Sequence, residues 1–311
     1  MKGLSATEQA ILRSLAYYDI FKYPLTTYEC WKFLYDPQQH LEATDFFQVQ
    51  KALGGLAQKN IIKDINGFWQ LKESADYYYL RQERYRTFVS KLRRARRWAR
   101  LFTFLDSVRF IAVVNSLGYQ NPEADDDIDL LVITKAGRIW LTRWWLTGFA
   151  KLLGLRPNLK HQANGLCLSF YVADNALAFE PLMINNQDIY FHFWLPHMTV
   201  LYDDGVSGDL IRQNQNWLKC FPNLHLEFTP LWPAASRLAK FLRWVSLPFI
   251  RPMWERWCKK IQLRLLPSNL AAVANKDTSV VINDQVLKFH NPDRRAYYYK
   301  EWQTKLANLN I

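Results

Sequence analysis

Apolar positions recur at helical spacing through the first part of the chain. Ser5 and Glu8 have the spacing of a capping box and predict the start of a helix, because each side chain can bond the other residue's backbone N–H. Thr26 and Glu29 repeat that spacing and predict a second helix. A third helix is expected over residues 46–58, where Val, Leu and Leu recur every three to four positions.

Two apolar runs then flank Asn66-Gly67, a dipeptide typical of a two-residue β-hairpin turn. Three helices followed by a hairpin predict a winged-helix-like module over residues 1–75. In such modules the third helix can lie in a DNA groove. The third helix here carries few basic residues, and winged helices also serve as protein-docking units. DNA and protein therefore both stay open as partners of this module.

Residues 76–106 predict one basic connecting helix, since residues 76–105 contain neither Gly nor Pro. Its arginines could contact the phosphates of a nucleic acid. The alternative is a solvated face of an amphipathic helix, because aromatic and aliphatic residues are interleaved with the basic ones. The candidates for weak nucleic-acid binding are Arg93, Arg94, Arg96, Arg97 and Arg100.

An apolar, β-branched run over residues 109–114 predicts a strand that ends at Asn115-Ser116. After a polar loop, residues 127–133 predict a second strand that begins with Asp127 and Asp129. Alternate residues of a strand project from one face, so these two carboxylates should lie side by side. Two carboxylates in that arrangement repel each other unless a cation lies between them.

Oxygen ligands of this kind suit Mg²⁺, with Mn²⁺ as an alternative, and Mg²⁺ completes its coordination with substrate phosphate oxygens. Paired metal ions of this type support phosphoryl and nucleotidyl transfer. A calcium-binding or helix-capping loop at Asp125–Asp127 is the competing interpretation. It is disfavoured because the EF-hand spacing and its distal Glu are both missing.

The order of strand, Asn115-Ser116, polar loop and Asp-Ile-Asp strand resembles the nucleotidyltransferase superfamily with the polymerase β-like fold. The chain also resembles uncharacterised bacterial proteins that join a winged-helix-like segment to this domain and carry a tail like LKFH (287–290) and DRR (293–295). The resemblance implies that Asp127 and Asp129 are the catalytic metal ligands. It implies a nucleotide-binding role for Asn115, Ser116 and Gly118, with an NTP as partner.

The chain departs from the family pattern at two points. Asn115 stands where the family has Gly. The family also places a third carboxylate on a later strand, and the strand expected over residues 166–172 has none. Ser169 is the residue expected to face the metals there. Asp174 or Glu180 could supply the third ligand only if the sheet brings it round.

The second half of the chain predicts mainly helices. A helix over residues 138–155 should cross back over the sheet between two strands. The nucleotidyltransferase core is expected over residues 107–190, followed by a helical C-terminal domain over 191–311. Within it, the basic, Trp-rich stretch 237–266 is favoured as core helix over peripheral membrane contact or base stacking.

The net charge of +12 favours an anionic partner. The four cysteines have no paired spacing and are expected to be buried thiols in a reducing compartment. No signal peptide or transmembrane segment is evident, so a cytoplasmic location is expected.

The predicted fold class is α/β in the α+β arrangement. The predicted function is Mg²⁺-dependent transfer of a nucleoside monophosphate from NTP to an unknown acceptor. The alternative is an inactive nucleotide-binding regulator that binds DNA or a protein through its winged helix.

Overall fold

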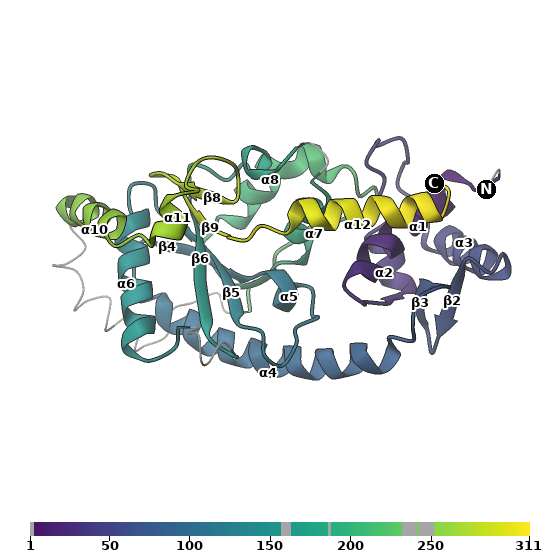
Figure 1. Ribbon diagram of the computed structural model, residues 1–311, viewed down its shortest axis with the longest axis horizontal. Coiled ribbons are helices and arrows are strands. Elements are labelled where there is room, and N and C mark those ends of the chain that lie inside the picture. Colours follow the sequence, from purple (N-terminus) through teal and green to yellow (C-terminus); the bar gives the residue numbers. More distant parts are fainter. Residues whose placement is uncertain (1–2, 157–162, 186–187, 232–240, 242–251) are drawn as a thin grey trace.

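The computed structural model describes residues 3–156, 163–185, 188–231, 241 and 252–311 (Figure 1). The protein is elongated, with a small three-stranded sheet toward one end and a six-stranded sheet toward the other. A single long helix, α4, runs beneath both in this view (Figure 1). Helices and both mixed and antiparallel sheets are present, which confirms the α+β class.

The N-terminal module follows the order predicted from its sequence. Both capping boxes form, with Ser5 at the start of α1 and Thr26 at the start of α2. The hairpin turn has positive φ at Asn66 (53°) and Gly67 (84°), the left-handed backbone that a two-residue turn of this kind requires. The elements are α1 (Ala6–Ile20), β1 (Leu25–Thr26), α2 (Thr27–Lys32), α3 (Phe46–Gln58), β2 (Ile62–Ile65) and β3 (Phe68–Leu71), with strand order β1-β3-β2.

Helix α4 (Tyr78–Phe102) is the predicted connecting helix, shorter at both ends than expected. Its buried residues recur every three to four positions. Phe88, Ala95, Ala99 and Phe102 pack into the core on one face of the larger sheet. The helix thus ties the N-terminal module to that sheet.

The larger sheet has the strand order β7-β4-β5-β6-β9-β8. Strands β5 and β6 are parallel, and helix α6 (Ile139–Leu152) connects them as predicted; the other neighbours are antiparallel. The strands are β4 (Val108–Val113), β5 (Ile128–Thr134), β6 (Leu166–Ala173), β7 (Thr199–Asp203), β8 (Val280–Ile282) and β9 (Val286–Phe289).

Strand β5 is buried on both faces, because helices cover each side of the sheet. Ile128, Leu130 and Val132 belong to the core shared with α4 and α6. Leu131 and Ile133 belong to the core shared with α7 (Ile189–Trp194) and α8 (Ser207–Leu218). Alternation along the strand places Asp129 on the α7 side.

The prediction that residues 191–311 are helical is wrong in one respect: β7, β8 and β9 all join the larger sheet. These strands are only three to five residues long and depend on partners far away in sequence, so local periodicity does not reveal them. The described helical elements after β6 are η1 (Glu180–Leu182), α7, η2 (Leu195–His197), α8, α10 (Pro252–Arg264), α11 (Ser268–Ala271) and α12 (Arg295–Asn308).

The C-terminal helix α12 returns to the N-terminal module, where it lies beside α1 (Figure 1). Trp302 Nε1 donates a hydrogen bond to the Arg13 carbonyl at 3.0 Å, and Lys305 Nζ pairs with Asp19 Oδ2 at 2.6 Å. Helix α12 is therefore attached to the N-terminal module by these two contacts with α1. The Trp-rich stretch 237–266, expected as core helix in preference to a membrane or base-stacking surface, lies largely outside the described residues before α10.

Candidate metal and nucleotide site

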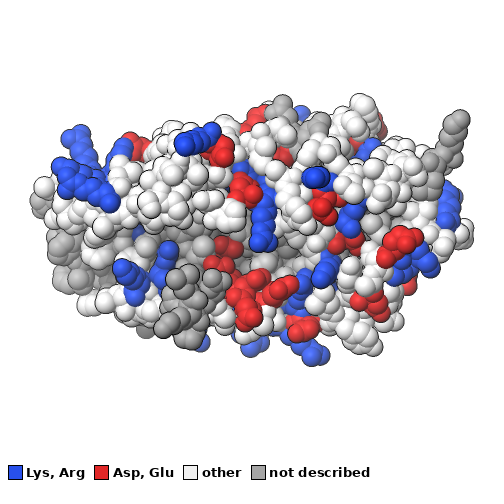
Figure 2. All heavy atoms as spheres, in the orientation of Figure 1, with Lys and Arg blue, Asp and Glu red and all other residues white. Residues whose placement is uncertain are grey.

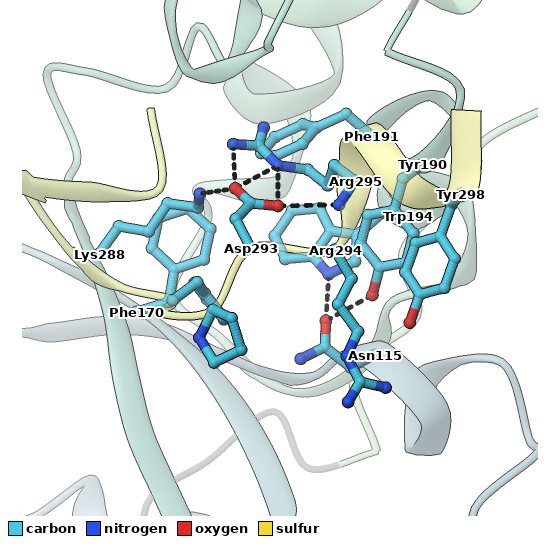
Figure 3. Close-up of a pocket in the computed structure, with 12 residues that line it drawn as sticks. Asn115, Phe170, Tyr190, Phe191, Trp194, Lys288, Asp293, Arg294, Arg295 and Tyr298 are labelled. Carbon is cyan, nitrogen blue, oxygen red and sulfur yellow. Dashed lines mark hydrogen bonds and ion pairs between the residues drawn. The ribbon is translucent and has the colours of Figure 1, made fainter. Parts of the chain in front are cut away.

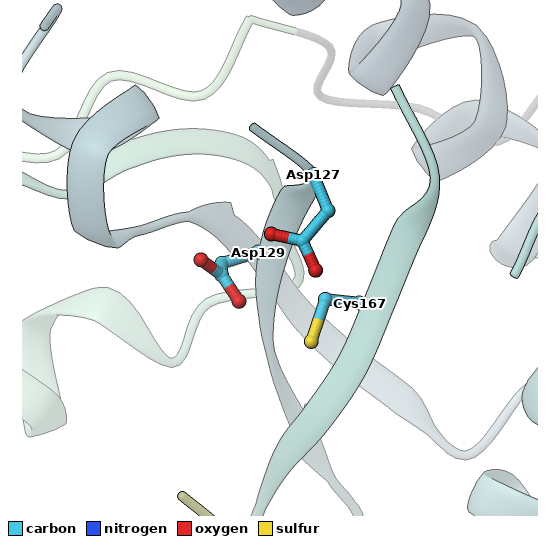
Figure 4. A group of neighbouring side chains, drawn as sticks. All are labelled: Asp127, Asp129 and Cys167. Carbon is cyan, nitrogen blue, oxygen red and sulfur yellow. The ribbon is translucent and has the colours of Figure 1, made fainter. Parts of the chain in front are cut away.

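The two predicted acidic residues lie together at the start of β5. Asp127 directly precedes the strand and Asp129 is its second residue. Their side chains project toward a common space between β5 and β6, as Figure 4 shows. The structure therefore places Asp127 and Asp129 on one face, as the alternation of strand side chains predicts.

Cys167 occupies the third position of this cluster. It lies directly opposite Asp129 in the parallel register of β5 and β6. One carboxylate oxygen of Asp127, one of Asp129 and the Cys167 Sγ lie within 4.8 Å of one another. Figure 4 shows the three side chains. Ser169, the residue expected to face the metals, lies next to the cluster, where its hydroxyl accepts a hydrogen bond from Cys167 Sγ at 3.3 Å.

The expected substitutes, Asp174 and Glu180, lie elsewhere. Asp174 follows the far end of β6, where its carboxylate accepts a hydrogen bond from the Ala136 N–H after β5. Glu180 is exposed and begins the short helix η1 beyond that end of the sheet. Because β5 and β6 are parallel, their far ends are removed from the acid pair by the full length of the strands. Among the described residues, Cys167 is the one that completes the cluster.

Burial and neighbouring carboxylates raise the pKa of all three groups of the cluster. Burial, followed by the charge of Asp127, raises the pKa of Asp129 to about 7. Burial also raises the pKa of Asp127, with a smaller contribution from the nearby Asp126 carboxylate. The pKa of the Cys167 thiol is raised well above its ordinary value by burial and by both carboxylates. A bound cation would reverse each of these effects.

Asn115 occupies a left-handed backbone position (φ 53°), which Gly adopts freely and Asn tolerates better than most residues. Asn115 is therefore compatible with the backbone conformation at this position. Its Oδ1 accepts hydrogen bonds from Tyr190 Oη at 3.0 Å and Trp194 Nε1 at 2.9 Å. A hydrogen bond from Asn115 also acts on Asp129, where it lowers the pKa against the larger effect of burial.

Ser116 lies beside the acid pair and is held by Asp126, a residue that the motif did not single out. Its Oγ donates to Asp126 Oδ2 at 2.7 Å, and the same oxygen accepts the Glu123 N–H at 2.9 Å. Lys91 of α4 fixes this loop from beneath, because its Nζ donates to the Asp126 carbonyl at 2.6 Å. The sequence did contain a signal for this contact. Lys91 lies on the apolar face of the helix predicted over residues 76–106, and an Asp-rich loop follows that helix in the chain.

Gly118 is buried and turned away from the acid pair. A Cβ added there would lie 3.0 Å from the His197 carbonyl oxygen, so the absence of a side chain serves close packing. Of the three predicted nucleotide-binding residues, Asn115 and Ser116 line the cleft described below, and Gly118 does not.

A cleft of about 540 Å³ opens over the acid pair, which forms part of its lining. Residues of α1 and of the start of α12 form other parts of the lining. Elements that are far apart in the sequence therefore enclose the cleft together. Lys22, Arg84 and Arg294 supply basic side chains. Figure 2 shows acidic side chains grouped near the middle of one face with basic side chains close by.

The basic side chains of the cleft differ in whether they already form ion pairs with carboxylates of the protein. Arg84 bonds Asn121 Oδ1 at 3.2 Å and pairs with Glu123. For Lys22 and Arg294, no ion pair with a described carboxylate is present. These two are therefore the cations best placed to meet an anionic group entering the cleft.

The arginines expected to contact nucleic acid lie on α4, outside the cleft. Arg93, Arg94, Arg97 and Arg100 are exposed, and Arg96 is half-buried. Arg94 Nε donates to the Asn164 carbonyl at 3.0 Å. The structure therefore does not bring these arginines to the acid pair.

Of the cysteines, Cys30, Cys220 and Cys258 are buried free thiols as expected, whereas Cys167 is only partly buried. None of the described helices has the length and apolar character needed to cross a membrane. No protein-family model, curated protein or solved structure matches this chain.

Proposed function

We propose that the chain binds an NTP together with a divalent cation at Asp127 and Asp129 and transfers the nucleoside monophosphate to an acceptor. The observation that carries this proposal is the pair of carboxylates, Asp127 and Asp129, that share one face at the start of β5. Burial and the charge of Asp127 raise the pKa of Asp129 to about 7, because two negative charges so close together are unfavourable. A cation between them relieves this repulsion.

The donor set fits a divalent cation, with one qualification. Two carboxylates are suitable ligands for Mg²⁺ and Mn²⁺, whereas a thiol is a soft donor that Mg²⁺ does not favour. The residues that would hold the ion are thus Asp127 and Asp129, with Cys167 as a third donor only for a softer ion. When bound, the cation supplies positive charge that neutralises the polyphosphate in nucleotidyl transfer.

The remaining tasks fall to other residues of the cleft. In this proposal the backbone beside Ser116 holds phosphate oxygens, and Ser116 Oγ joins it once its hydrogen turns from Asp126 to the phosphate. Lys22 and Arg294 neutralise the phosphate charge. In the reaction, an acceptor hydroxyl oxygen bonds to the α-phosphorus while the bond from that phosphorus to the β-phosphate oxygen breaks. Pyrophosphate leaves, and the hydroxyl proton passes to a base or to water.

The test is product analysis by mass spectrometry. The full-length protein is incubated with each NTP in turn and with Mg²⁺ or Mn²⁺, and self-modification, pyrophosphate release and modification of added acceptors are measured. The matched control is the double variant Asp127→Asn, Asp129→Asn, which keeps side-chain size and removes both charges. Activity that is equal in the parent and the double variant would show that the acid pair is not the site.

Cys167 favours a second candidate function. Its thiol has a raised pKa and two carboxylate neighbours, so it is a poor substitute for an ionised third carboxylate. A protein that binds the nucleotide without transferring it, and uses the N-terminal module to contact DNA or a protein, fits that substitution. Tight nucleotide binding without any product from the four NTPs would support this regulator over the enzyme.

A further inference from the structure

A second cavity, of about 190 Å³, lies next to the acid-pair cleft (Figure 3). Side chains of β6, α7, β9 and the start of α12 line it. It shares Asn115, Tyr190, Arg294 and Tyr298 with the cleft, so the two spaces are neighbours on either side of these residues. We call this second cavity the aromatic pocket.

Five phenyl, phenol and indole side chains form one part of its wall. The Tyr190 and Tyr298 rings stack on each other with centroids 5.4 Å apart, and Phe170 and Trp194 lie 5.6 Å apart. Phe191 adds a further ring. Flat apolar walls of this kind suit a planar ring system, whose faces are apolar and whose edge is polar.

Polar side chains form the rest of the wall, and one buried atom among them lacks a partner. These residues are Asn115, Lys288, His290, Asp293, Arg294 and Arg295. His290 Nδ1 is buried, and it has no hydrogen-bond partner among the described residues. Burial lowers the pKa of His290 to about 3, so its imidazole is neutral near pH 7. A neutral imidazole forms a hydrogen bond with an uncharged polar group. It does not supply the charge that a phosphate requires.

Buried polar atoms without a partner are uncommon in folded proteins, and a ligand is one common reason for them. Lys288 offers a second polar group, since its Nζ donates to the Thr278 carbonyl and lies 3.9 Å from Asp293 Oδ2. The aromatic pocket therefore combines aromatic walls with a charged side, in which Asp293 pairs with Arg295 and Lys288, and with an unpartnered His290 nitrogen for a ring edge.

Asn115 links this pocket to the acid pair. Its Oδ1 accepts hydrogen bonds from Tyr190 and Trp194 of the pocket wall, as Figure 3 shows, while its carboxamide also acts on Asp129. A ligand with an aromatic ring at one end and phosphates at the other would reach from the pocket to the carboxylates past this residue.

We propose that the aromatic pocket binds the nucleobase of the NTP whose phosphates lie at Asp127 and Asp129, with His290 reading the edge of the base. This inference rests on the proposed nucleotide site and adds its base-recognition half. The hydroxyl-bearing acceptor is not the favoured occupant, because a hydrophilic group gains little from five aromatic rings.

Calorimetry on the full chain separates this inference from the proposed function. ATP, GTP, CTP, UTP and inorganic tripolyphosphate are each titrated in the presence of Mn²⁺. Tripolyphosphate reports the metal and phosphate half alone. If the base is bound in the pocket, at least one NTP binds about tenfold or more tightly than tripolyphosphate, as stacking and one hydrogen bond imply.

Two variants assign that difference to the pocket. His290→Leu removes the unpartnered nitrogen without breaking a protein hydrogen bond, and Phe191→Leu removes an aromatic ring that lines the aromatic pocket and not the cleft. Each should lower NTP affinity about tenfold and leave tripolyphosphate affinity unchanged, which also shows that the variant is folded. His225→Leu is the matched control, because His225 is exposed and lines neither space.

Equal affinities for tripolyphosphate and every NTP would overturn the base pocket and leave the metal and phosphate site standing. The base pocket would also be overturned if both pocket variants bind the preferred NTP as tightly as the parent. Failure of tripolyphosphate and of all NTPs to bind would overturn the nucleotide site together with its base pocket.

Discussion

Asp129 and Cys167 face each other across the parallel strands β5 and β6, and together with Asp127 they form a cluster that could hold a metal ion. The strand register, and not a loop, sets this relationship. A substitution at Cys167 therefore changes the donor set without moving the acid pair. This makes the chemistry of the cluster directly testable.

The variant Cys167→Asp should raise Mg²⁺-dependent turnover. It replaces a protonated thiol with a carboxylate that can take a proton from the acceptor, and general-base catalysis is typically worth about 10²- to 10⁴-fold. Pyrophosphate release at saturating NTP measures the change. Cys167→Ser is the control, since it adds no charge. If the parent is active and Cys167→Asp abolishes that activity, position 167 is not where a third carboxylate would act.

The double variant Asp127→Asn, Asp129→Asn should lose the metal dependence of nucleotide binding. Both changes keep side-chain size and remove the negative charge that attracts the cation. Calorimetric titration of an NTP with and without Mn²⁺ measures the difference. Folding should be retained or improved, because a repelling pair is removed. Metal-dependent binding that survives in the double variant would place the site elsewhere.

The free energy of unfolding of the metal-free protein should carry a contribution from Asp129 that falls as pH rises. The pKa of Asp129 is about 7 in the folded chain and ordinarily 3.8, so the folded state binds the extra proton between these values. This contribution is complete below about pH 4 and lost above about pH 7.

Urea unfolding of the parent and of Asp129→Asn across pH 4 to 8 isolates this effect. The difference between the two should favour the variant increasingly as the pH rises. Asp125→Asn, which changes an exposed carboxylate of the same loop, serves as control. A pH-independent difference for Asp129→Asn would show that the carboxyl has an ordinary pKa.

Asn115 should be sensitive to substitution for two separable reasons. Asn115→Ala strains a left-handed backbone and leaves the Tyr190 hydroxyl and the Trp194 N–H without their acceptor. A loss of about 2 kcal/mol or more in the free energy of unfolding is expected. Asn115→Gly keeps the backbone conformation and loses only the acceptor, so its loss should be smaller. Equal losses would show that the backbone contributes nothing.

Any nucleic-acid binding should be mainly electrostatic and centred on the arginines of α4. On duplex DNA, each phosphate contact that is lost flattens the slope of log affinity against log salt by about 0.9. The variant replaces five arginines by Gln, and its slope is compared with that of the parent. The residues are Arg93, Arg94, Arg96, Arg97 and Arg100.

The matched control for this variant removes the same number of charges elsewhere. Five exposed lysines are changed to Gln, namely Lys51, Lys72, Lys219, Lys276 and Lys300. The salt slope should stay close to that of the parent. Equal flattening in both variants would indicate a general charge effect, and no binding by the parent at low salt would leave the α4 arginines as a solvated face.

Local sequence determined much of the architecture near each element. The capping boxes at Ser5 and Thr26, the turn at Asn66-Gly67 and the bounds of α3 all depend on contacts within a few residues, and all were predicted. The common face of Asp127 and Asp129 follows from strand alternation alone. These features need no knowledge of the rest of the chain.

Tertiary structure alone decided which distant residues meet these carboxylates. Cys167 faces Asp129 through the register of β5 and β6, which the sequence does not specify, and Ser169, the residue expected to face the metals, lies beside it and bonds Cys167 Sγ. Tyr190 and Trp194 reach Asn115 from 75 and 79 residues away. The cleft itself requires α12 to return to α1. Such contacts depend on the packing of whole elements, which no local pattern encodes.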